Sequence, residues 1–152
     1  MNYTSKEYNF LLYVMSKNIM TYQEVLEWSY TQYTDDGIDP FIEKIVLSSD
    51  SEEVFQLVRN TFQVYGEISE ELQIGEVASN FSNGKISLCK AVREILFGLD
   101  VELNKKDQEL LYLADHLYDC YGNESDAIEN EVENVLKPYA LKYNKLIELF
   151  SV

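Results

Sequence analysis

Cysteine, proline, glycine and cationic side chains are all scarce in this sequence of 152 residues. Its two cysteines form no CxxC motif and no Cys/His pair with the spacing of a zinc site, so we expect free thiols and no bound metal. Two prolines and six glycines leave no run long enough for an interdomain linker. We therefore predict one domain over residues 1–152 that needs no disulfide, metal or cofactor.

Long apolar runs are missing as well, and none approaches the roughly 20 residues that a membrane-spanning helix requires. The apolar run near the N-terminus follows Glu7 and precedes no small-residue cleavage site, so it does not resemble a secretory signal. We expect a soluble, cytoplasmic protein.

Positive charge is scarce relative to negative charge, because 12 Lys and Arg residues stand against 27 Asp and Glu residues. The formal net charge of −15 repels phosphate backbones and anionic membrane surfaces. We therefore predict neither direct nucleic-acid binding nor membrane binding. The complementary partner is a basic protein.

Helix start signals are frequent. In a capping box, a Ser or Thr and a Glu three residues later each satisfy a backbone N–H that the helix leaves without a partner. Proline directly after an N-capping Asp marks a helix start too, since its missing N–H costs nothing at the first helical position. These signals occur at Thr4/Glu7, Thr21/Glu24, Ser49/Glu52 and Asp39-Pro40.

Apolar residues at helical spacing follow each of these starts and continue to the end of the chain. We expect Gly66 to end one helix in a left-handed cap, Gly75 to weaken the next, and Pro138 to kink or divide the last. No convincing strand is found. The predicted fold is all-α, a single-domain bundle or stacked helical hairpins of about seven to eight helices.

Residues 107–134 contain nine carboxylates and no Lys or Arg. Their first part, residues 107–121, is predicted to form a helix with one buried and one acidic side. The expected buried side is Leu110, Leu113, Ala114, Leu117, Tyr118 and Tyr121, and the expected outer side is Gln108, Glu109, Tyr112, Asp115, His116 and Asp119. A basic section over residues 85–106 is a candidate to pack against it.

Carboxylates four residues apart, as in Asp115 and Asp119, destabilise a helix by a few tenths of a kcal/mol, which favours a surface retained for binding. Solubility alone is the alternative explanation. Tyr112 is a candidate aromatic anchor on this surface. The predicted partner-binding residues are Glu109, Tyr112, Asp115, His116, Asp119, Glu129 and Glu133.

Catalysis finds little support in the sequence. His116 is the only histidine, and Cys120, four residues later, makes a pair that could chelate a metal, although a single pair on one helix is a weak signal. The sequence contains no glycine-rich phosphate loop and no GxSxG nucleophile motif. We predict that the protein is not an enzyme, and an enzyme that uses His116 with nearby carboxylates remains an alternative.

In its size, in TYQEVLEWSY at residues 21–30, in DDGIDPFIEKI at residues 35–45 and in the acidic block from residue 107, the chain resembles bacterial immunity proteins of contact-dependent and polymorphic toxin systems. This resemblance implies tight binding to one toxin domain, often a basic nuclease, whose active site is then covered. It assigns no residue roles. A second hypothesis is a helical adaptor or regulatory protein that binds a partner helix in an apolar groove.

Overall fold

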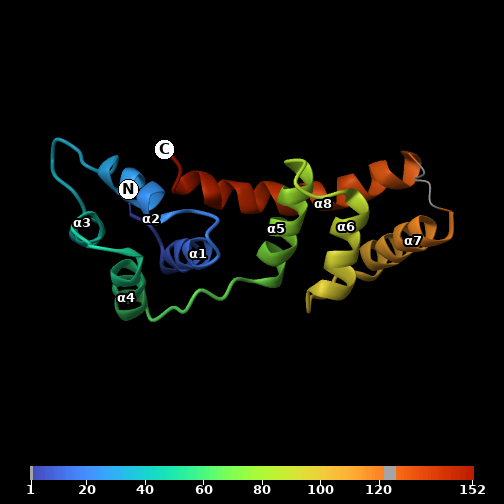
Figure 1. Ribbon diagram of the computed structural model, residues 1–152, viewed down its shortest axis with the longest axis horizontal. Coiled ribbons are helices and arrows are strands. Elements are labelled where there is room, and N and C mark those ends of the chain that lie inside the picture. The colour runs from blue at the N-terminus through green and yellow to red at the C-terminus, as the bar shows by residue number, and fades with distance from the viewer. Residues whose placement is uncertain (1, 122–125) are drawn as a thin grey trace. The chain divides into compact units, whose positions relative to one another are not determined.

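The computed structural model describes residues 2–121 and 126–152, and the side chains of all of these except residues 118–121 and 126. The protein is 70% helical, so the all-α prediction is confirmed (Figure 1). Its described elements are α1 (Ser5–Ser16), α2 (Tyr22–Tyr30), α3 (Pro40–Val46), α4 (Ser51–Phe62), α5 (Glu70–Ser82), α6 (Leu88–Arg93), the π-helical turn η1 (Glu94–Gly98), α7 (Lys105–Tyr121) and α8 (Asp126–Leu149).

The first three helix starts follow the sequence signals. The Thr4 Oγ1 accepts a hydrogen bond from the Glu7 N–H at 3.2 Å, and the Glu7 carboxylate accepts one from the Thr4 N–H at 2.7 Å. α2 begins with the same reciprocal pair at Thr21. Asp39 caps α3, so these three predictions are confirmed.

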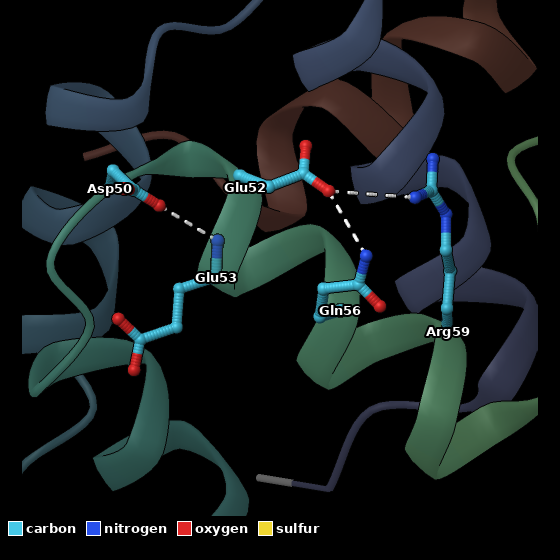
Figure 2. A network of polar contacts seen from close by, with 5 residues as sticks. All are labelled: Asp50, Glu52, Glu53, Gln56 and Arg59. Carbon is cyan, nitrogen blue, oxygen red and sulfur yellow. Dashed lines mark hydrogen bonds and ion pairs between the residues drawn. The ribbon is translucent and has the colours of Figure 1, made fainter.

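The predicted capping box at Ser49 and Glu52 is wrong by one residue. Asp50 is the N-cap of α4, and its Oδ1 accepts a hydrogen bond from the Glu53 N–H at 2.9 Å. In Figure 2 the Glu52 carboxylate points toward Gln56 and Arg59 and away from the cap, and it accepts a hydrogen bond from Gln56 at 3.0 Å. An aspartate is as good an N-cap as a serine, so spacing alone did not decide between them.

The end of α4 differs from the prediction as well. The left-handed residue that closes it is Gln63, with a φ of 54°, and not Gly66. Gly66 has a positive φ of 86° but lies beyond the helix, where its N–H donates to the Asn9 Oδ1 at 2.7 Å. The Asn9 amide also donates to the Glu67 carbonyl at 2.6 Å, so one α1 side chain holds this connecting segment.

Contacts along the chain define two compact units, one of residues up to 68 together with 146–152, and one of residues 69–145. The expectation of a single domain stays a prediction. In the first unit, α1 is buried on most of its circumference, and Trp28 packs edge-on against the Tyr3 and Phe150 rings. The Trp28 indole N–H also donates to the Tyr3 hydroxyl at 3.3 Å.

The second unit has its own core, formed by α5, α6, η1, α7 and the larger part of α8 (Figure 1). Buried aliphatic side chains from all five elements meet there: Ile74, Val77, Ala78, Leu88, Ala91, Val92, Ile95, Leu111, Ala114, Val132, Leu136 and Ala140. The buried Ser79 hydroxyl donates a hydrogen bond to the half-buried Asn144 side-chain oxygen at 2.7 Å. This core holds the walls of the site described below.

Gly75 lets α5 and α8 approach each other closely. A Cβ at this position would lie 2.6 Å from the Tyr139 carbonyl oxygen and 2.8 Å from the Tyr143 Cβ. The glycine that weakens the helix in the sequence is therefore required by packing. α8 continues unbroken through Pro138, so the helix is not divided there.

Replacing Gly75 with alanine should lower the free energy of unfolding by about 1–3 kcal/mol, because the added methyl group meets backbone and not a flexible side chain. The higher helix propensity of alanine offsets only part of this loss. Urea denaturation followed by circular dichroism measures it, with Ser82→Ala at an exposed position of α5 as the control. A Gly75→Ala variant as stable as the wild type would contradict the close packing.

Stability should fall as the pH rises above 10. Burial, the largest cause, raises the pKa of the Tyr8 and Tyr143 phenols above their ordinary value of 10.0, with Asp39 adding to it for Tyr8 and Glu76 for Tyr143. Above pH 10 the unfolded tyrosines lose protons that the folded ones keep, so folding is favoured less. Urea denaturation between pH 8 and pH 11 measures the slope, which Tyr8→Phe should reduce and Tyr30→Phe, at an exposed position, should not.

Candidate functional site

α7 buries a side that matches the expected one only in part. Leu111 and Ala114 are buried in the core of the second unit, whereas Leu113 is 45% exposed. The predicted burial of Ala114 is therefore confirmed and that of Leu113 is wrong, and Leu111, which was not on the expected buried side, faces the core. Leucines at positions 110, 111, 113 and 117 cover so much of the circumference that their spacing does not select one face.

An ion pair accompanies the observed rotation of α7. The Arg93 Nε donates to the Asp115 Oδ1 at 2.9 Å, and the Asp115 side chain is only 15% exposed. This contact confirms that the basic section packs against the acidic helix. It also shows that the prediction of an outward-facing Asp115 is wrong, because an arginine of the same molecule neutralises this carboxylate.

An open groove lies on the second unit, and the exposed Leu113 of α7 is one of its lining residues. Its volume is about 970 Å³, and all of its lining residues belong to α5, α7 and α8 within that unit. They are Glu71, Lys106, Asp107, Glu109, Leu110, Leu113, Glu131, Asn134, Val135, Pro138 and Tyr139. We refer to this feature as the α7–α8 groove.

Apolar side chains line the groove from two helices. α7 contributes Leu110 and Leu113, and α8 contributes Val135 and Pro138. Pro138 has no N–H. The carbonyl of Asn134, four residues earlier, therefore lacks the hydrogen-bond donor that it would have in a regular helix. The groove therefore has an apolar lining on both of these helices.

Carboxylates dominate the charge of the groove, because Glu71, Asp107, Glu109 and Glu131 face one lining ammonium group, that of Lys106. Lys142 binds the Glu71 carboxylate. The Lys105 Nζ lies 4.0 Å from the Glu109 Oε1, but both side chains are well exposed to solvent, so this pair neutralises Glu109 weakly.

The phenol of Tyr139 responds to this negative charge. Burial raises its pKa above the ordinary value of 10.0, and the carboxylates of Asp107 and then Glu71 raise it further. The two acids come from different helices, so negative potential reaches the groove from both α5 and α7. A cation is the complementary ligand.

A second exposed feature lies on α7 and η1. The rings of Tyr112 and Phe97 are 6.2 Å apart in an edge-to-face arrangement, and they are 46% and 64% exposed. Phe97 belongs to the π-helical turn, which replaces the regular end of α6. The sequence indicated Tyr112 as an aromatic anchor but not its neighbour, since a π-turn has no signature in apolar spacing.

The predicted binding residues occupy several places. Glu109 lines the α7–α8 groove, Tyr112 packs on Phe97, Asp115 binds Arg93, and His116 is exposed on α7. On α8, Glu129 is half-buried, and Glu133 is exposed in a separate shallow hollow beside Phe81 and Lys137. The side chains of Asp119 and of Cys120, the predicted metal-pair partner of His116, lie outside the described residues.

Several groove residues were absent from the prediction, chiefly Glu71, Asp107 and Glu131. Asp107 and Glu131 belong to the acidic stretch of residues 107–134, so the sequence indicated their charge but not their position in a groove. Glu71 comes from a helix more than thirty residues earlier, and only the tertiary packing of the second unit brings it to the groove.

No family model, curated protein or solved structure matches this chain. Within residues 2–121 and 126–152, no helix has the length and apolar character needed to cross a membrane. Among the described side chains, no three of the His, Cys, Asp and Glu residues are grouped so that they could hold a metal ion.

Replacing Arg93 with alanine should lower the free energy of unfolding by about 1 kcal/mol, because a largely covered carboxylate loses its guanidinium partner. A double-mutant cycle with Asp115→Ala, followed by urea denaturation, isolates the pair. Lys105→Ala, which affects an exposed pair at 4.0 Å, serves as the control and should change stability by less than about 0.5 kcal/mol. A coupling energy of zero between Arg93 and Asp115 would show that the contact does not fix α7.

Proposed function

We propose that this protein is an acidic protein-binding module that acts as an immunity protein and neutralises a basic, nuclease-type toxin domain. The observation that carries the proposal is the α7–α8 groove, where the 45% exposed Leu113 lies among four carboxylates. An exposed apolar surface next to acidic groups favours a partner with both apolar and cationic residues.

The two kinds of group have different tasks in this proposal. Carboxylates attract a basic partner over a distance and speed its association at low salt. Apolar contacts with residues such as Leu110 and Leu113 then slow its dissociation. For a nuclease, Glu109 and Glu131 would take the place of substrate phosphates opposite its Lys and Arg residues.

Inhibition of this kind requires no chemistry from the protein itself. Bound at the toxin's substrate path, the module excludes the substrate by occupying space and matching charge. Asp115 takes no part, because Arg93 already binds it, and Lys142 binds Glu71 in the same way, so the attracting charge of the groove rests mainly on Asp107, Glu109 and Glu131. The role would place the protein in the cytoplasm, where an immunity protein meets its toxin.

A helical adaptor or regulatory protein is the second candidate. The apolar lining of the groove favours it, since two helices, α7 and α8, provide the walls for a third. The two functions differ in their partner: an adaptor joins two proteins and leaves both active, whereas an immunity protein abolishes a toxin's activity.

Association with the toxin domain encoded by an adjacent toxin gene should slow at least tenfold between about 50 and 500 mM salt, because salt screens the attraction. Replacing Glu109 and Glu131 together with lysine should slow it by a similar factor and abolish protection against the toxin. Stopped-flow mixing measures the rates.

The matched control replaces Glu43 and Glu148 with lysine, which changes the net charge equally at exposed positions that do not line the groove. Equal slowing by both double variants would assign the effect to net charge alone. A salt-independent rate, or a toxin that remains active when bound, would refute the immunity proposal.

A further inference from the structure

The α7–α8 groove has the dimensions of a short helical segment. Its lining residues extend from 106 to 113 on α7 and from 131 to 139 on α8, which is about two helical turns, or roughly 10–12 Å, on each wall. With a volume of about 970 Å³, the groove is much larger than one side chain needs. It lies at the upper end of the roughly 300–1,000 Å³ of small-molecule sites.

Apolar groups repeat at helical spacing on both walls. Leu110 and Leu113 are three residues apart on α7, and Val135 and Pro138 are three residues apart on α8. Apolar groups at this spacing on two walls match the apolar stripe of a third helix, whose side chains recur every three to four residues. The exposure of Leu113 shows that part of this apolar surface faces solvent.

The charges restrict which helix fits. Asp107 and Glu109 are on the α7 wall, Glu131 is on the α8 wall, and Glu71 comes from α5. An uncharged helix would cover these carboxylates without offering them a partner, at a desolvation cost. An acidic helix would be repelled. A helix with cations on both sides of its apolar stripe satisfies both walls.

We propose that the α7–α8 groove binds one helix of the partner, about two turns long, with an apolar stripe flanked on both sides by lysine or arginine. The proposal rests on the proposed function in so far as the partner is a basic protein, and it adds that one amphipathic helix carries the contact.

Three synthetic peptides of about 14 residues test the proposal without the toxin. One places leucines at i, i+3, i+4 and i+7, a stripe of two turns, with lysines beside them, one has the same composition in scrambled order, and one replaces each lysine with glutamate. Fluorescence anisotropy should show that the amphipathic basic peptide binds at least tenfold more tightly than the scrambled peptide. The acidic peptide should not bind.

Substitutions in the full-length protein locate the binding. Leu113→Asn should weaken binding of the amphipathic peptide at least tenfold, whereas Leu141→Asn, at a 53% exposed position of α8 that does not line the groove, should leave it unchanged. Replacing Glu109 and Glu131 with glutamine should weaken binding several-fold and reduce its dependence on salt. Both leucines are already exposed, so neither change should unfold the protein.

Equal affinity for the amphipathic and scrambled peptides would overturn the proposal and indicate attraction by charge alone, which leaves the proposed function intact. Equal loss of binding in Leu113→Asn and Leu141→Asn would overturn it too, because the peptide would then bind outside the groove. Displacement of the peptide by spermine at similar affinity would indicate a site for a small polycation. The amphipathic peptide could bind more tightly than the scrambled peptide while the association rate of the toxin does not depend on salt. This result would refute the immunity role but not the helix-binding site.

Discussion

The close approach of α5 and α8 at Gly75 is the constraint on which the second unit depends. Backbone at Tyr139 occupies the space that any other side chain at position 75 would fill. The same residue lines the α7–α8 groove through its phenol, next to Pro138. Gly75 of α5, which does not line the groove, thus sets how closely α8 approaches α5. A rigid wall of this kind reduces the ordering cost of binding.

The other wall is joined to α6 by the contact between Arg93 and Asp115. This ion pair accompanies a rotation of α7 in which Leu111 is buried and Leu113 faces solvent. The Asp115 carboxylate therefore makes a contact within the fold, whereas other carboxylates of the acidic stretch, including that of Glu109, remain at the surface. The acidic helix accordingly has two roles, since part of its charge holds the unit together and part is presented outside.

Local signals in the sequence were sufficient for most of the secondary structure. Capping at Thr4, Thr21 and Asp39 involves residues at most three positions apart, so their spacing reports it directly. α4 shows the limit of this reasoning, because Asp50 and Ser49 are both good caps, and in the structure Asp50 caps the helix while the Glu53 carboxylate accepts a hydrogen bond from the Ser49 N–H. The all-α prediction rests on many such signals, so the misplaced cap of α4 does not change it.

The site was harder to predict because it depends on rotation and on distant residues. Net charge and the acidic stretch indicated a basic partner, and Glu109 was among the expected residues. Periodicity could not set the rotation of α7, where leucines lie on several sides, and it carried no information about Glu71. Helix existence is thus a local property of this chain, whereas the composition of the groove is a tertiary one.

Trp28 is the only tryptophan of the chain, and it is buried in the first unit against Tyr3 and Phe150. Its emission wavelength therefore reports the packing of that unit, while the α7–α8 groove lies among residues of the other. Intrinsic fluorescence follows one half of the molecule, so unfolding curves recorded by emission and by helicity need not coincide. A difference between the two signals would measure how independently the two units unfold.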